Sequence, residues 1–135
     1  SVLLSIDRMK CSYIDVIQLH DPEFTPSIDL LVHETIPALA KLRDETQPPL
    51  VRAIGMTGYP LSMQRLLIQR SWTEHGIKID QSLSYCHFNL HDMSLFRHNK
   101  KDAFSFADFC KSKNIGLLAA APLSMGLLTH DGPPD

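Results

Sequence analysis

The chain has 135 residues, enough for one modest domain or for part of a larger one, and its 44% hydrophobic and 21% charged residues are ordinary for a folded globular protein. Its 13 basic and 15 acidic residues give a net charge of −2, which is too weak to gather phosphate backbones or anionic lipids. We therefore expect neither nucleic acid nor a membrane as a partner. The 3 cysteines lack CxxC spacing, which argues against a disulfide framework and favours a cytoplasmic location.

The first predicted elements are a helix and a buried strand. Four apolar residues near the start follow the spacing of one helical face: Val2, Leu3, Ile6 and Met9. The apolar run 13–19 predicts a strand that ends at His20, because the Asp21-Pro22 pair that follows favours a turn. A second helix is expected around Ile36, Leu39 and Leu42, with Pro37 in its first turn.

The rest of the chain continues this alternation of strands and helices. A short strand at 50–56 is closed by Thr57-Gly58, and a helix that opens at Pro60 ends at Gly76. We expect that helix to have an apolar face of Leu61, Leu66 and Leu67, with Trp72 packed beneath it. The remaining predicted elements are a strand at 77–85, a helix at 102–113 and a strand at 115–121.

Alternating helices and strands, with repeats of about 30 to 40 residues, predict an α/β fold of roughly four parallel strands. This number of strands makes part of a barrel or a small open sheet, and periodicity does not separate the two. The absence of GxGxxG and GxxxxGK[ST] motifs argues against dinucleotide-binding and P-loop folds. The chain begins in a helix and stops in the loop 132–135, so we expect both ends to be truncated.

His20 is the first candidate for chemistry. It stands where a buried strand meets a turn, and parallel α/β enzymes carry their catalytic groups at the carboxyl ends of the strands. A single histidine at a strand end is more commonly a hydrogen-bonded structural residue. A metal-dependent hydrolase built on His20 would need ligands at several strand ends, and the sequence offers only Asp21 beside it.

Four segments resemble one known family over nearly the whole chain: SYIDVIQLHDP (12–22), ETIPAL (34–39), VRAIGMTG (51–58) and APLSMGLLT (121–129). They are similar to the fourth strand, the following helix, the fifth strand and the seventh strand with its cofactor loop in the aldo-keto reductases. Three shorter segments are most similar to the branch that contains the L-galactose dehydrogenases: 57–61, 83–87 and 125–129. The resemblance implies a partial (β/α)8 TIM barrel, with residues 1–135 as the central-to-C-terminal part of one reductase domain.

The resemblance also implies a reaction. Members of the family move a hydride between NAD or NADP and a carbonyl or alcohol carbon, and the branch implies a small sugar oxidised at C1 to the lactone. His20 would hydrogen-bond the substrate oxygen. The family's proton-donating tyrosine, with its lysine and aspartate, lies on earlier strands, so we expect this chain alone to be inactive. The alternative is a non-catalytic binding or dimerisation module, and the oligomeric state is left open.

The resemblance further implies a set of cofactor contacts. Thr57 matches the residue whose hydroxyl reaches the nicotinamide carboxamide, and Gly58 stands where many members have asparagine. For the glutamine of the sixth strand two registers differ by one residue, and we favour Ser82 over Gln81, with Ser84 also facing inward. Ala120 stands where many members stack an aromatic ring. The pyrophosphate would lie on the turn after it, which contains Pro122, Leu123, Ser124 and Gly126.

Two further histidines have the spacing of metal ligands but receive a simpler interpretation. His87 and His91 are four residues apart, yet the sequence shows no third ligand that matches them. We interpret both as solvated histidines of a loop. We therefore expect no bound metal.

Overall fold

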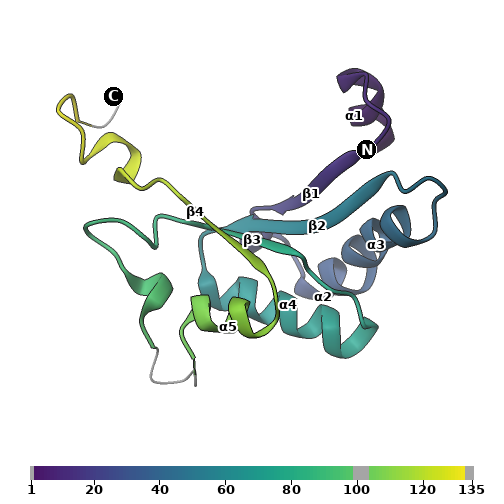
Figure 1. Ribbon diagram of the computed structural model, residues 1–135. Coiled ribbons are helices and arrows are strands. Elements are labelled where there is room, and N and C mark those ends of the chain that lie inside the picture. Colours follow the sequence, from purple (N-terminus) through teal and green to yellow (C-terminus); the bar gives the residue numbers. More distant parts are fainter. Residues whose placement is uncertain (1, 99–103, 133–135) are drawn as a thin grey trace.

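The computed structural model describes residues 2–98 and 104–132, and its centre is one four-stranded parallel sheet (Figure 1). The strands are β1 (Ile14–His20), β2 (Val51–Gly58), β3 (Gln81–Tyr85) and β4 (Gly116–Ala120), paired in chain order. All the expected strands are present. β3 begins later than predicted because Gly76 and Ile77 still close the preceding helix, with their N–H groups on the carbonyls of Trp72 and Ser71.

Helices cover one face of this sheet. They are α2 (Ile28–Leu30), a π-helical turn (Leu31–Thr35), α3 (Ile36–Asp44), α4 (Leu61–His75) and α5 (Phe106–Ser112). Short 3-10 turns lie at 22–24, 94–96 and 124–126. Helix α1 (Val2–Met9) stands apart beyond the amino end of β1, and none of its residues is buried (Figure 1). Within residues 2–98 and 104–132, no helix combines the length and the apolar character that crossing a membrane requires.

The helix around Pro37 differs from its prediction. Pro37 lies in the first turn of α3, as predicted, but α3 continues a helical stretch that already begins at Ile28, nine residues before Pro37. A proline in an α-helix clashes with the carbonyl four residues before it, which here belongs to His33. The π-turn widens the helix at this point, and the Ile36 N–H reaches back to the Leu31 carbonyl.

The core lies between the helices and one face of the sheet. Ile54 and Met56 of β2 face α4, where Leu67 and Ile68 meet them, and all four side chains are buried. Leu66 and Trp72, which were expected to pack inward, are 40% and 55% exposed. That expectation was wrong because the helical period turns Leu66 away from the sheet and leaves Trp72 at the margin of the buried face.

Helix α5 begins at Phe106, directly after its capping residue Ser105, rather than at residue 102. The Ser105 hydroxyl accepts the N–H of Asp108 at 3.1 Å, so the first turn starts at Phe106. Residues 102 and 103 of the predicted helix lie outside the described part of the chain. Phe106, Phe109 and Cys110 of α5 are buried in the core.

Two neighbouring leucines of α4 test this packing with the same substitution. We expect Leu67→Ala to lower the free energy of unfolding by about 2–5 kcal/mol, because its fully buried side chain would leave a cavity. Leu66→Ala should cost at most about 1 kcal/mol, because that side chain keeps much of its contact with solvent. Urea denaturation of both variants measures the difference, and equal losses would contradict the assigned face of α4.

Candidate functional site

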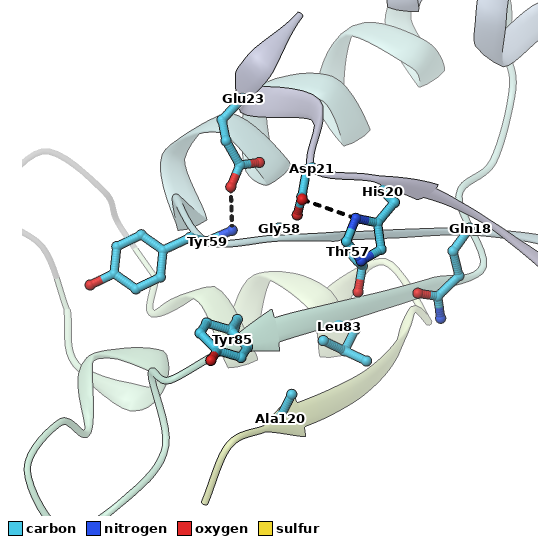
Figure 2. A pocket seen from close by; sticks show the side chains of 10 residues that line it. All are labelled: Gln18, His20, Asp21, Glu23, Thr57, Gly58, Tyr59, Leu83, Tyr85 and Ala120. Carbon is cyan, nitrogen blue, oxygen red and sulfur yellow. Dashed lines mark hydrogen bonds and ion pairs between the residues drawn. The ribbon is translucent and has the colours of Figure 1, made fainter. Parts of the chain in front are cut away.

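A pocket of about 510 Å³ lies on the open face, at the carboxyl ends of the strands (Figure 2). It is lined by Gln18, His20, Asp21, Glu23, Thr57, Gly58, Tyr59, Leu83, Tyr85 and Ala120. The parallel register pairs His20 with Thr57, Thr57 with Leu83, and Tyr85 with Ala120. Side chains of paired residues point to the same face, so this register gathers residues far apart in sequence into one pocket.

His20 ends β1 and projects into the pocket. Its side chain is 72% exposed, and Nδ1 lies 3.1 Å from Asp21 Oδ2. The Asp21 carboxylate therefore lies beside this side of the ring, and Nε2 is the nitrogen farther from it. Asp21 has a positive φ of 49°, and its N–H donates to the Thr57 carbonyl, which turns the chain away from the sheet. The Asp-Pro turn is thus confirmed.

Thr57 combines burial with an unused hydroxyl. The residue is 7% exposed, and within the described residues its Oγ1 has no hydrogen-bond partner. A buried hydroxyl without a partner costs about 1–3 kcal/mol, and a ligand that hydrogen-bonds it removes this cost.

Glu23 is a pocket residue that sequence reasoning missed. Its Oε1 accepts the Tyr59 N–H at 2.8 Å, and its Oε2 is buried without a hydrogen-bond partner among the described residues. A Cβ placed on Gly58 would come within 2.6 Å of this Oε2. The Glu23 carboxylate thus occupies the space that a side chain at position 58 would enter. The only sequence signal is an acidic residue just after the Asp21-Pro22 turn.

The favoured register of β3 is wrong. Ser82 and Ser84 are fully buried on the helix-covered face. The Ser82 hydroxyl donates to Gln64 Oε1 of α4, and Ser84 Oγ lies 3.0 Å from His87 Nδ1. Gln81 faces the open side instead, where its Oε1 accepts from Gln18 Nε2 at 2.7 Å. The prediction relied on small polar side chains being suited to the lumen of a barrel. In the structure, Ser82 and Ser84 instead make buried contacts with α4 and with the loop after β3.

The predicted cofactor contacts at the end of β4 and after it only partly join the site. Ala120 lines the pocket, whereas Pro122, Leu123, Ser124 and Gly126 lie on the turn beyond it and do not. The N–H groups of Ser124 and Gly126 donate within the turn, to the carbonyls of Ala121 and Leu123. Ser124, Met125 and Gly126 have positive φ values of 50°, 55° and 91°, so the chain holds a costly conformation here.

His87 is buried rather than solvated. It is 8% exposed, its ring lies 4.7 Å from that of Tyr59, and burial lowers the pKa of its imidazole. The prediction failed for His87 because the chain folds back over the end of β3, and it is confirmed for His91, which is exposed. Through the Ser84 and Tyr59 contacts, His87 supports the outer wall of the pocket.

Comparison with known proteins identifies the family of this chain. A model of the aldo/keto reductase family matches residues 1–134. The chain belongs to the aldo/keto reductase family. It is 40% identical over 131 residues to L-galactose dehydrogenase of Arabidopsis thaliana, which covers 97% of this chain and 36% of that protein. It is 31% identical over 103 residues to D-arabinose 1-dehydrogenase of Saccharomyces cerevisiae, which covers 75% of this chain and 29% of the yeast protein.

Solved structures agree on the fold of this reductase chain. An aldo/keto reductase from Brucella melitensis superposes with a TM-score of 0.64 at 23% identity, over 95% of this chain and 41% of that one. A second reductase, from Pseudomonas aeruginosa, gives 0.59 at 18% identity, over 88% and 38%. These neighbours are TIM barrels, so the predicted α/β fold of parallel strands is confirmed, and the chain spans about two fifths of such a barrel.

The corrected orientation of Ser82 generates a stability prediction. Ser82→Ala should lower the free energy of unfolding by about 1–3 kcal/mol, because Gln64 Oε1 would stay buried without its donor. Ser62 is exposed on α4, the helix that carries Gln64. Ser62→Ala should therefore change the free energy of unfolding by less than about 0.5 kcal/mol. Chemical denaturation of both variants measures this. If Ser82→Ala is as harmless as Ser62→Ala, the Ser82 hydroxyl is not in the buried layer.

The buried His87 generates a pH prediction. Its native pKa lies below the unfolded value of about 6.5, so the unfolded state binds the proton more readily. The contribution of His87 to stability is present above pH 6.5 and is lost as the pH falls from there through the native pKa. His87→Gln should remove this component from the unfolding free energy measured between pH 5 and 8, and the exposed-site variant His91→Gln should retain it. A profile unchanged by His87→Gln would contradict the assignment.

Proposed function

We propose that the protein carrying this chain oxidises a small aldose at C1, with NAD or NADP as the hydride acceptor. The observation that carries the proposal is the pocket, which joins His20 to a buried Thr57 hydroxyl at the carboxyl ends of paired strands. The sugar class is supported by the names of the relatives, one an L-galactose dehydrogenase and one a D-arabinose 1-dehydrogenase. Because the chain spans 36% and 29% of these relatives, the activity of the whole protein belongs to the proposal.

The unused polar atoms of the pocket fit a nicotinamide carboxamide. Such an amide has one carbonyl acceptor and an NH2 donor. The Thr57 hydroxyl can donate to the carbonyl, and Glu23 Oε2 can accept from the NH2 group. We therefore assign to Glu23 the contact that asparagine would make at position 58. When bound, the nicotinamide supplies the acceptor for a hydride.

The turn after β4 is the place that we propose for the pyrophosphate. Three successive residues with positive φ cost about 1–3 kcal/mol for each non-glycine member, and such conformations gather at functional sites. The internal hydrogen bonds of Ser124 and Gly126 fix the shape of the turn. Ala120, at the end of β4, leaves open space in the pocket where a larger side chain would project.

His20 orients the substrate. Its Nδ1 lies beside the Asp21 carboxylate, so Nε2 is the ring nitrogen left to hydrogen-bond the C1 hydroxyl. Oxidation removes a hydride from C1, which goes to the cofactor, and a proton from that hydroxyl. The family resemblance assigns proton transfer to a tyrosine on an earlier strand, and this chain offers no counterpart. We therefore propose that residues 1–135 by themselves do not turn over.

The cysteines support a cytoplasmic location for the protein. All three are free, and Cys110 is a buried residue of α5. Burial raises the pKa of its thiol to about 12, which keeps it in the unreactive protonated form. Free thiols are typical of proteins in reducing compartments.

A dehydrogenase assay on the natural polypeptide that carries this sequence tests the proposal. L-galactose and D-arabinose are offered with NAD and with NADP, and reduced cofactor is followed by absorbance. We expect turnover, a loss of about 10²–10³-fold in kcat for His20→Ala, and a rise of about 2- to 10-fold in the cofactor KM for Thr57→Val. His98→Ala removes an exposed imidazole away from the pocket and should leave both parameters unchanged.

The second candidate function is a non-catalytic binding or dimerisation module, and the opposite results in this assay would favour it. β1 and β4 are edge strands, and their unpaired backbone groups could pair with another chain. A folded polypeptide with no turnover on either sugar and either cofactor, together with a dimer in solution, would favour the non-catalytic module. Wild-type kinetics for His20→Ala would remove that residue from the chemistry.

A further inference from the structure

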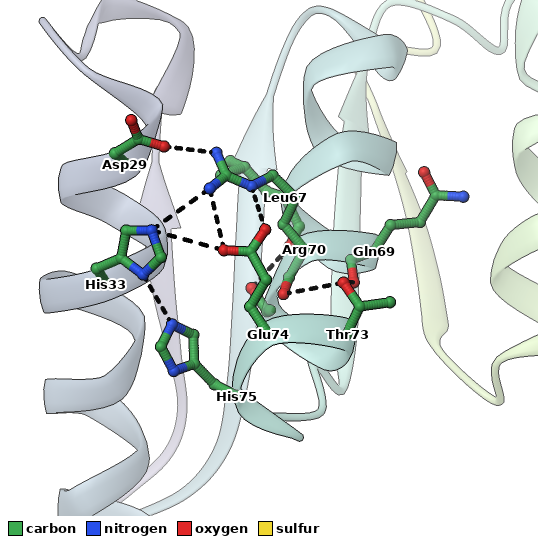
Figure 3. Close-up of polar contacts among 9 residues, drawn as sticks. Asp29, His33, Leu67, Gln69, Arg70, Thr73, Glu74 and His75 are labelled. Atoms are coloured by element: carbon green, nitrogen blue, oxygen red, sulfur yellow. Dashed lines mark hydrogen bonds and ion pairs between the residues drawn. The ribbon is translucent and has the colours of Figure 1, made fainter.

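A second cluster of polar side chains lies on the outer surface, between the π-turn and the end of α4 (Figure 3). His33 Nδ1 is 3.0 Å from His75 Nε2, and His33 Nε2 is 3.5 Å from Glu74 Oε2. One ligand atom from each of His33, Glu74 and His75 can be chosen so that all three lie within 4.8 Å of one another. All three residues are exposed, so an ion from solvent can reach them.

The atoms suit a divalent transition metal. Imidazole and carboxylate ligands bind Zn²⁺ at about 2.0–2.2 Å, and two ligands of a tetrahedral ion therefore lie about 3.3 Å apart. The nitrogens of His33 and His75 are already near this separation. Small rotations of exposed side chains bring the carboxylate into the same range. Two histidines with one carboxylate leave a fourth position for water.

The surroundings hold the carboxylate in place. Arg70 Nε donates to Glu74 Oε1 at 2.6 Å, while Arg70 Nη1 donates to Asp29 at 2.7 Å. The arginine thus lies between two carboxylates, and it lowers the pKa of both. Partners of this kind orient the ligands of metal sites. Glu74 Oε2 also accepts from Arg70 Nη2 at 3.0 Å and lies 3.5 Å from His33 Nε2.

His33 owes its place to an irregular helix. It is the middle residue of the π-turn, and its carbonyl is the one that the Pro37 ring would strike in a regular α-helix. π-turns occur frequently at functional sites. Here the widened turn presents an imidazole to the last turn of α4, 42 residues later in the chain.

We propose that His33, Glu74 and His75 bind one Zn²⁺ or a similar divalent transition-metal ion, which ties the helix 28–44 to the end of α4. Gln64 contacts the pocket edge near the start of α4, and Glu74 follows it by ten residues, about 15 Å of helix. The ion therefore stabilises the helical layer and does not reach the pocket. It replaces the expectation of no metal, which considered only His87 and His91.

Zinc titration of the natural polypeptide tests this site, with Zn²⁺ alone as the probe. Isothermal calorimetry on metal-free protein should show one site whose affinity falls by about 10- to 100-fold or more in His33→Ala and in His75→Ala. His91→Ala, which removes another exposed imidazole, should titrate like the wild type. Zn²⁺ should also raise Tm in the wild type and in His91→Ala, but not in the two ligand variants.

The comparison of variants separates this site from zinc bound elsewhere in the polypeptide. Circular dichroism confirms that each variant is folded, as the exposure of these residues leads us to expect. Identical titrations for His33→Ala, His75→Ala and His91→Ala would overturn the proposal. Unchanged affinity in Glu74→Gln would overturn the three-ligand assignment. Neither result depends on whether the pocket oxidises a sugar.

Discussion

The alternation of side chains across a parallel sheet that helices cover on one face only is the constraint on which this structure depends. In β2 the apolar side chains of Ile54 and Met56 face the helices, and in β3 the residues on that side are Ser82 and Ser84. The intervening residues then face the open side, and Thr57 is among them. A shift of one residue would bury the pocket residues and expose the core. The same hydrophobic requirement therefore selects both the fold and the site.

Gln64 connects the helix-covered core to the pocket. Its Nε2 donates to the Gly58 carbonyl at 2.8 Å, and its Oε1 accepts from Ser82, so one fully buried side chain joins the end of β2 and the start of β3 to α4. A buried amide is tolerated only when its polar groups are paired. The serines of β3 meet that need. Their position under the helix fixes Leu83 and Tyr85 on the pocket side.

Sequence reasoning found the features that depend on local chemistry. Gly76 ends α4 with a φ of 66°, and the chain turns after His20, because glycine and Asp-Pro have strong backbone preferences. It missed Glu23, the orientation of Ser82 and the burial of His87, because each depends on a partner that is distant in sequence or reached only through the folded loop. The π-turn before Pro37 was missed for a related reason. A proline predicts that a regular helix is disturbed, but not whether the helix ends or widens.

The two ends of α4 have different roles. In barrels of parallel strands the carboxyl edge carries the chemistry, whereas the opposite edge contributes to stability. The start of α4 faces the first edge through Gln64, which holds the floor of the pocket. Its end carries Glu74 and His75, packed against His33 of the neighbouring helix. A cross-link there, whether by hydrogen bonds or by an ion, would hold the helical layer rigid without placing a charge near the reacting carbon. Rigid support of this kind is what a site made of strand ends requires, because its residues come from separate strands.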